Sequence, residues 1–277
     1  MEGRQIRLNR LFKRSDRLFI VPMDHGVTIG AVGGLKDMHR VVQAVSAGGA
    51  DAIVVHKGIA RRIGPALKGG DCELIVHLSG STALGPAPNR KELVASPEHA
   101  VQLGATAVSV HVNLGDPAEP EMLRDLGRVS EQCQSWGMPL LAMMYVRDGS
   151  KESEFHPGKV AHAARIAEEL GADIVKVNYT GSVETFSGVV SAVSIPVIIA
   201  GGPKAGSLRD LLLMIRDAVR AGARGVAIGR NIFEDQNPAG LSALVRRILD
   251  DPQLAERDDA YLDALCADWT AVSRGGS

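Results

Sequence analysis

The sequence predicts an α/β barrel, and three observations support this fold class. Along the 277 residues, eight apolar runs rich in β-branched residues alternate with amphipathic segments of helical period. Several of these helical segments end at a glycine that leads directly into an apolar run, as in E-L-G-A-D-I over 169–174. A helix stop followed by a strand is the αβ joint of a parallel sheet. Eight such units in about 250 residues predict a TIM (β/α)8 barrel.

The order of the elements follows from the same patterns. The predicted strands cover 18–23, 52–55, 73–78, 107–112, 140–144, 174–177, 197–200 and 226–228. The predicted helices cover 37–47, 97–102, 120–136, 158–170, 185–193, 208–221 and 239–249. We expect residues 1–17 to form an extra helix that closes the bottom of the barrel. We also expect 252–273 to form a C-terminal helix and 274–277 to be frayed.

The alternative architecture is a doubly wound parallel sheet. That fold carries a glycine-rich fingerprint after its first strand. Residues 22–26 read P-M-D-H-G instead, so the barrel is favoured. With 45% hydrophobic and 23% charged residues, the chain is expected to form a single domain over 1–277, with its core at about 18–250.

Composition also narrows the choice of partner and compartment. A net charge of -1 does not favour nucleic acid or an anionic membrane, so small molecules are the expected partners. The three cysteines lie far apart with no metal-type spacing, which argues against a disulfide framework or a zinc site. No apolar run approaches the length of a membrane span, and the basic N-terminus has no apolar signal region. We expect a cytoplasmic protein that forms a homo-oligomer.

The stretch 171–179 contains the first candidate catalytic residue. Lys176 lies inside a short apolar run that reads as a buried parallel strand. Burial disfavours an ammonium ion and lowers the pKa of a lysine, so the amine can be a neutral nucleophile that forms a Schiff base. Two other interpretations stay open at this point, in which Lys176 reaches solvent at the strand end or pairs with Asp173.

Polar residues gather where the predicted strands end, which is the catalytic face of a TIM barrel. They are Asp24, His25, His56, Lys57, His77, Ser79, His111, Asn113, Tyr145, Arg147 and Lys176. An amine, a phenol and a carboxylate together can form an imine and move protons beside it. Asp24 could instead cap a turn, and Tyr145 could be a rim aromatic. The histidines come from separate strands without fixed local spacing, so no metal site is predicted.

Two glycine turns follow the last two strands. They are A-G-G-P-K, which contains Gly201, Gly202 and Lys204, and A-I-G-R, which contains Gly229 and Arg230. In this fold the corresponding loops commonly bind a phosphate at the start of a short helix. The glycines could also serve only as tight turns. Their occurrence on adjacent strands favours a phosphorylated substrate.

The motifs F-I-V-P-M-D-H-G, L-I-V-H-L-S-G-S-T, A-V-S-V-H-V-N-L-G, P-L-L-A-M-M-Y, D-I-V-K-V-N-Y-T-G and A-G-G-P-K occur in this order from Phe19 onward. In these motifs the chain resembles the archaeal-type class I aldolase family, and the resemblance extends over residues 19–233. The resemblance is closest to the branch that contains 2-amino-3,7-dideoxy-D-threo-hept-6-ulosonate synthase. Bacterial relatives of that branch join dihydroxyacetone phosphate to aspartate semialdehyde.

The resemblance implies roles for three residues. Lys176 in K-V-N-Y-T-G corresponds to the Schiff-base lysine, Tyr145 in M-M-Y to the acid/base tyrosine, and Asp24 in M-D-H-G to the family's aspartate. No cofactor is implied. The family usually has Pro-Arg-Gly after the tyrosine, whereas this chain has V-R-D-G and a polar stretch up to residue 156. This loop bears on the choice of substrate.

These expectations combine into one hypothesis. Lys176 attacks a phosphorylated ketone, Asp24 and Tyr145 shuttle protons, and the resulting enamine adds to L-aspartate 4-semialdehyde. The amino acid head of that aldehyde needs a countercharge, for which the candidates are His25, Lys57, His111 and Arg147. Two alternatives remain: a class I fructose-bisphosphate aldolase, and a barrel without turnover that binds phosphate ligands.

Overall fold

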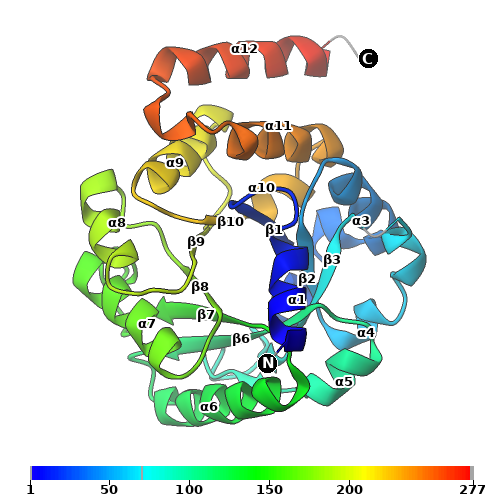
Figure 1. Ribbon diagram of the computed structural model, residues 1–277, viewed down its shortest axis with the longest axis vertical. Coiled ribbons are helices and arrows are strands. Elements are labelled where there is room, and N and C mark those ends of the chain that lie inside the picture. The colour runs from blue at the N-terminus through cyan, green and yellow to red at the C-terminus, as the bar shows by residue number, and fades with distance from the viewer. Residues whose placement is uncertain (1, 70, 275–277) are drawn as a thin grey trace.

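Eight parallel strands close into a barrel, with helices around its outside (Figure 1). The structure is a computed structural model that describes residues 2–69 and 71–274. Around the barrel the strands are ordered β1-β10-β9-β8-β7-β6-β3-β2, and β1 pairs with β10 to close it. Their bounds are β1 Leu18–Pro22, β2 Ala52–Val55, β3 Glu73–His77, β6 Ala107–Leu114, β7 Leu140–Val146, β8 Ile174–Val177, β9 Val197–Ala200 and β10 Gly225–Ala227. The TIM barrel is confirmed, and the open doubly wound sheet was the wrong alternative.

The predicted helices are also present, with ends that differ from the expected ones by a few residues. They are α3 Met38–Ala47, α5 Pro97–Gln102, α6 Glu119–Trp136, α7 Pro157–Glu169, α8 Val183–Val190, α9 Leu208–Arg220 and α11 Pro238–Asp250. Shorter helices follow three strands: α2 His25–Ile29, α4 Lys57–Ala60 and α10 Arg230–Phe233. Three short turns of helix lie between these elements: η1 Gly33–Leu35, η2 Gly64–Leu67 and η3 Ser153–Phe155.

Local sequence explains where several helices begin and end. The side chains of Ser96, Ser182 and Ser207 accept hydrogen bonds from backbone N–H groups in the first turns of α5, α8 and α9. A polar acceptor at this position satisfies a donor that the helix itself leaves unpaired. Helix α6 ends at Gly137, whose φ of 56° is the left-handed conformation that favours glycine.

Side chains on each strand alternate between two separate apolar layers, as the two-residue period of a strand requires. One layer fills the barrel and includes Ile20, Val54 and Ile198. The other lies between the barrel and the helices and includes Phe19, Ile53 and Ile199. A polar side chain that has the inward register and stands at the carboxyl end of a strand therefore faces the mouth of the barrel.

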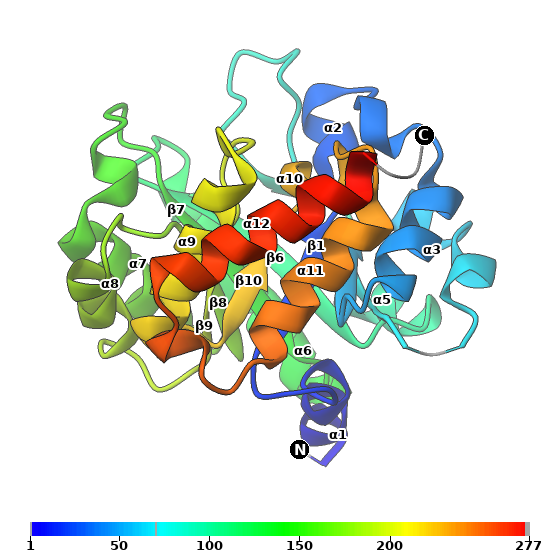
Figure 2. The same ribbon diagram turned by 90° about the horizontal axis from the view of Figure 1, so that it is seen from above.

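The N-terminal helix α1, Glu2–Leu11, lies across one end of the barrel (Figures 1 and 2). Leu11 is fully buried, and Leu8 and Phe12 pack against the layer inside the barrel. Arg4 of this helix pairs with Asp173 at 2.7 Å. The expected bottom closure is thus confirmed, although the helix is shorter than 1–17.

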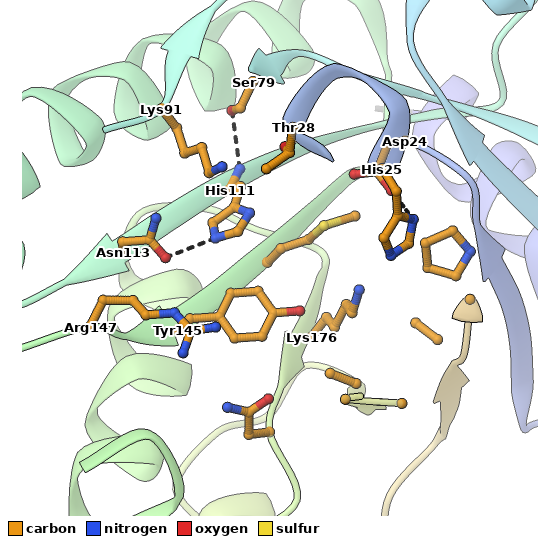
Figure 3. Close-up of a pocket in the computed structure, with 18 of the residues that line it drawn as sticks. Asp24, His25, Thr28, Ser79, Lys91, His111, Asn113, Tyr145, Arg147 and Lys176 are labelled. Carbon is orange, nitrogen blue, oxygen red and sulfur yellow. Dashed lines mark hydrogen bonds and ion pairs between the residues drawn. The ribbon is translucent and has the colours of Figure 1, made fainter. Parts of the chain in front are cut away.

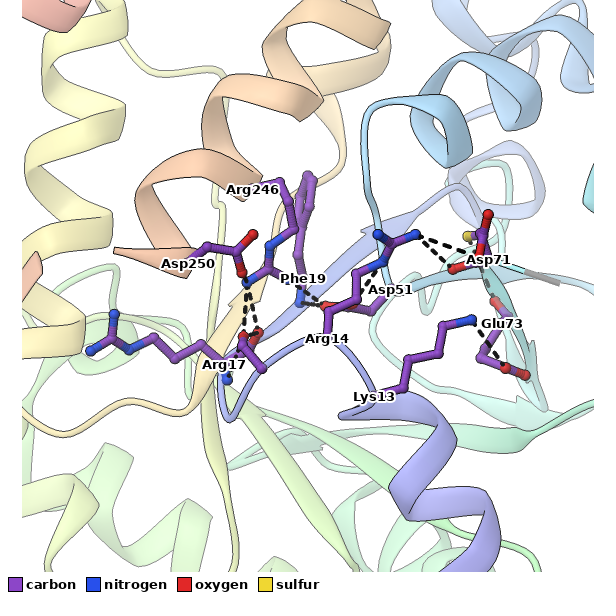
Figure 4. Close-up of polar contacts among 11 residues, drawn as sticks. Lys13, Arg14, Arg17, Phe19, Asp51, Asp71, Glu73, Arg246 and Asp250 are labelled. Carbon is purple, nitrogen blue, oxygen red and sulfur yellow. Dashed lines mark hydrogen bonds and ion pairs between the residues drawn. The ribbon is translucent and has the colours of Figure 1, made fainter. Parts of the chain in front are cut away.

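An ionic cluster joins the N-terminal segment to α11 (Figure 4). Asp51 is almost fully buried and accepts hydrogen bonds from the Phe19 N–H at 2.7 Å and from Arg246 at 2.8 Å. Burial raises the pKa of Asp51 to about 6, although Arg246 opposes the shift. Arg246 also binds Ser15 and Asp250. The cluster therefore belongs to the scaffold, since Phe19 and Asp51 stand at the amino ends of β1 and β2.

The C-terminal helix α12, Asp259–Arg274, follows a short turn of helix, η4 Leu254–Glu256, and lies beside α9. Arg209 of α9 binds both Asp259 and Asp263. The predicted terminal helix is confirmed, but it begins later than residue 252 and still includes Arg274. The fraying expected for 275–277 lies outside the described residues.

All three cysteines are free. In the described ranges no helix has the length and apolar character needed to cross a membrane.

Candidate active site

A pocket of about 580 Å³ opens at the carboxyl ends of the barrel strands. Cavities of this size are typical of small-molecule sites. Its polar lining includes one or two residues from most strands, each in the register that faces the barrel interior. They are Asp24, His56, His77, Ser79, His111, Asn113, Tyr145, Lys176 and Asn178, with Gly202 and Gly229 continuing the last two strands.

Lys176 lies on β8 two residues after Ile174, which faces the barrel interior. Its side chain is 6% exposed and points into the pocket (Figure 3). Asp173 is held by Arg4 and by the Leu140 N–H, so it is not the partner of Lys176. No other described residue forms a hydrogen bond or ion pair with the Lys176 amine. The two alternative interpretations of this lysine, a solvent-reaching side chain and a pair with Asp173, were therefore wrong.

Asp24 lies just beyond β1, and its carboxylate contacts two histidines. One oxygen lies 3.6 Å from His77 Nε2 and the other lies 3.8 Å from His25 Nδ1. Burial by itself raises the pKa of Asp24, but His77, His25 and Lys176, which are protonated in the acid range where Asp24 titrates, together lower it to about 2. Asp24 occupies the N-cap position of α2, but its side chain makes no capping hydrogen bond and remains available to the pocket. At neutral pH it is a carboxylate that can accept a proton.

The histidines around Asp24 are neutral at pH 7. Burial lowers the pKa of His77 to about 4, against the opposing effect of Asp24. His77 Nδ1 shares a hydrogen bond of 2.7 Å with Ser109 Oγ, which fixes the ring. Burial also lowers the pKa values of His25 and His56. These rings therefore shape the pocket without adding positive charge beside the lysine.

An imidazole ring and a guanidinium group pack against the ring of Tyr145. Its ring lies 4.8 Å from that of His111, and the Arg147 guanidinium lies 5.5 Å from the ring centre. His111 Nε2 in turn binds Asn113 Oδ1 at 2.9 Å. Figure 3 shows the hydroxyl of Tyr145 directed toward Lys176. That hydroxyl has no hydrogen-bond partner among the described residues, so the contacts orient the ring and leave its proton donor facing the pocket.

The two glycine turns approach each other at another part of the pocket. Arg230 Nη2 donates to the Gly202 carbonyl at 2.8 Å, and the buried Arg230 Nε has no partner in the described chain. A Cβ at Gly229 would lie 2.6 Å from the Pro22 carbonyl oxygen, so only glycine fits there. Within the described residues, the backbone N–H groups of Gly202, Gly229 and Arg230 have no acceptor. Several N–H donors therefore remain available to an anion.

Two of the predicted site residues lie away from the pocket. Lys57 is exposed on α4 and donates to the Val94 carbonyl, and Lys204 is exposed near the Glu234 carbonyl. Neither lines the pocket, whereas His25, His111, Arg147, Gly201 and Gly202 do. Lys57 stands one residue after the inward-facing His56 and so has the opposite register, which places it outside the lining.

The pocket lining also includes residues that the sequence patterns did not indicate, among them Lys91, Lys151, Glu154 and Asn178. Asn178 could have been found, because it stands two residues after Lys176 in the inward register. Lys91 and Glu154 come from segments outside the barrel strands, so no strand pattern points to them. Across 2–69 and 71–274, no group of three or more His, Cys, Asp and Glu side chains is placed to hold a metal ion.

Comparison with known proteins identifies close relatives. A synthase from Halobacterium salinarum, 2-amino-3,7-dideoxy-D-threo-hept-6-ulosonate synthase, is 44% identical over 90% of this chain and 92% of its own. The 2-amino-4,5-dihydroxy-6-oxo-7-(phosphonooxy)heptanoate synthase of Streptomyces griseus is 42% identical over 87% of this chain and 88% of its own.

A solved structure of a Schiff-base-forming fructose-1,6-bisphosphate aldolase is also similar. It superimposes with a TM-score of 0.81 at 31% identity, over 89% of this chain and 99% of its own. The family model for DeoC/LacD family aldolases matches residues 18–235, which is the barrel from its first strand to the segment after α10. The chain therefore belongs to the DeoC/LacD family of aldolases.

Proposed function

We propose that this enzyme joins dihydroxyacetone phosphate to L-aspartate 4-semialdehyde through a Schiff base on Lys176. The observation that carries the proposal is a buried, unpaired lysine that shares one pocket with an ionised Asp24 and with a Tyr145 whose hydroxyl is directed toward it. A primary amine, a base and a proton donor are the groups that imine and enamine chemistry needs.

The names of the relatives support this choice of substrates. The product named for the Streptomyces griseus relative is a seven-carbon chain with an amino group at C2, hydroxyls at C4 and C5, a ketone at C6 and a phosphate ester at C7. A retro-aldol cut between C4 and C5 of such a chain yields dihydroxyacetone phosphate and aspartate 4-semialdehyde. The same pair of substrates accounts for a pocket with free N–H donors at the glycine turns and with charged side chains elsewhere.

Each step has a group in the pocket to perform it. The Lys176 amine attacks the ketone carbon of the donor, and loss of water leaves an imine. Removal of a proton from the adjacent hydroxymethyl carbon gives the enamine, which attacks the aldehyde carbon and forms the C–C bond. Asp24 and Tyr145 transfer the protons, and the new alkoxide is protonated to a hydroxyl. Water then hydrolyses the imine, which releases the product and restores Lys176.

The glycine turns supply the proposed phosphate site. The N–H groups of Gly202, Gly229 and Arg230, together with the Arg230 guanidinium, would hold the phosphate of the donor. Gly201 lines the same corner of the pocket. We leave Lys204 out of the proposed site because its side chain lies outside the lining. Binding at this point would place the ketone of the donor against Lys176.

The fructose-bisphosphate aldolase alternative is weaker, since the structural relative with that activity is 31% identical whereas the two synthases are 42 to 44% identical.

We further propose that the chain is one domain that acts in the cytoplasm as a homo-oligomer.

Incubation with dihydroxyacetone phosphate and L-aspartate 4-semialdehyde should therefore yield a seven-carbon amino keto acid phosphate, detectable by mass spectrometry. The control reaction replaces the semialdehyde with glyceraldehyde 3-phosphate. Faster formation of fructose 1,6-bisphosphate in the control reaction would show that the enzyme is a fructose-bisphosphate aldolase instead.

Tyr145→Phe removes a proton donor and leaves the ring contacts intact, so turnover should fall on the order of 10²- to 10⁴-fold. Asp24→Asn replaces the base with a neutral side chain of similar shape, and its turnover should fall within the same range. Both variants are measured by initial rate alongside circular dichroism to confirm folding. Parental activity in a folded Tyr145→Phe variant would return the tyrosine to a purely structural role at the rim.

Arg230→Ala should raise the KM for dihydroxyacetone phosphate, because its guanidinium and the turn that it braces are expected to contact only the donor. Inorganic phosphate should compete with the donor in the parent enzyme and compete less in the variant. Steady-state kinetics with each substrate varied in turn measure both effects. An increase in KM for the aldehyde alone would show that the donor and acceptor ends of the pocket have been assigned in reverse.

A further inference from the structure

A hairpin outside the barrel contributes a cation to the pocket. Its strands are β4 Ser79–Gly80 and β5 Glu92–Leu93, and the loop between them projects at the end of the barrel opposite α1 (Figure 2). Lys91 closes this loop and lines the pocket, with its side chain half-buried. Its Nζ donates to Ser81 Oγ at 2.5 Å and lies 3.5 Å from the Pro88 carbonyl oxygen. These contacts within the loop hold the amine at the mouth.

Lys91 belongs to a group of charges on the Tyr145 side of the pocket. Figure 3 shows Lys91, Asn113 and Arg147 on the opposite side of Lys176 from His25. Arg147 forms an ion pair with Glu154, whose side chain is 22% exposed. Burial and the charge of Arg147 lower the pKa of Lys91, while Asp24 opposes the shift. The lining also includes Lys151, from the segment between Arg147 and Glu154, so cations outnumber the carboxylate of Glu154 among these described residues.

This arrangement has an excess positive charge and also offers one carboxylate. A ligand group that carries both an anion and a cation complements it better than a phosphate does, because a phosphate would leave Glu154 facing a like charge. An α-amino acid head is such a group. Its carboxylate can bind cations, and its ammonium can bind a carboxylate, each through charge-assisted hydrogen bonds.

We propose that Lys91 and Arg147 bind the α-carboxylate of the acceptor aldehyde and that Glu154 binds its α-ammonium group. The inference rests on the proposed function and adds the residues that select the acceptor. In this arrangement the ligand's ammonium replaces part of the Arg147–Glu154 contact, and the aldehyde end extends toward Lys176. The glycine turns at 201–202 and 229–230 remain for the donor phosphate.

Two substitutions and three aldehydes test this assignment. L-aspartate 4-semialdehyde carries both charges, 4-oxobutanoate keeps the carboxylate but lacks the ammonium, and butanal carries neither. Lys91→Met should raise the KM by about ten- to a hundredfold for the first two aldehydes, the range for loss of a hydrogen bond to a charged group. It should leave the weak reaction of butanal unchanged. Glu154→Gln should raise the KM for L-aspartate 4-semialdehyde and have little effect on 4-oxobutanoate.

Arg90→Met is the matched control, since it removes a cation from the same loop. Arg90 pairs with Glu92 and does not line the pocket, so its KM values should equal those of the parent. Borohydride trapping with dihydroxyacetone phosphate alone distinguishes a failure of the proposed function from a failure of the acceptor site. A parent enzyme that forms no adduct would overturn the proposed function. Normal trapping in Lys91→Met, with KM values for both charged aldehydes equal to the parent's, would overturn the acceptor site alone.

Discussion

The side-chain alternation of the barrel strands is the constraint on which the site depends. Each strand directs every second residue inward, and the inward residues below the mouth are apolar and tightly packed, as Ile174 is on β8. The next inward residue on that strand is Lys176, which is therefore buried by the same packing that stabilises the barrel. Its side chain is 6% exposed, and its amine faces the pocket, which stays open to substrate.

Electrostatics divide the pocket into regions with different tasks. Around Lys176 burial keeps the histidines neutral while Asp24 is ionised, so the chemistry takes place beside a carboxylate. Other positive charge is found at Arg230, which binds the glycine turn at Gly202, and at Lys91 and Arg147 on the side of Tyr145. This separation allows two charged substrates to be held at opposite ends with their carbonyl groups between them.

Much of the fold and the central site could be predicted from sequence, because both follow from local periodicity. Strand ends in a parallel barrel converge, so Asp24, Tyr145 and Lys176 could be grouped from the sequence alone. Lys57 lies outside the pocket lining, because it follows the inward-facing His56 by one residue and so has the opposite register. Lys91 could not be predicted, since it enters the pocket from a hairpin whose placement depends on tertiary packing.

The central claim is that Lys176 is the nucleophile, and covalent trapping tests it most directly. Borohydride is added to the enzyme with dihydroxyacetone phosphate, and the digested protein is analysed by peptide mass spectrometry. We predict a reduced adduct on the peptide that contains Lys176, and no adduct in Lys176→Met, which removes the only group able to form the imine in this account. An adduct on another lysine, or full turnover in the folded Lys176→Met variant, would contradict the account.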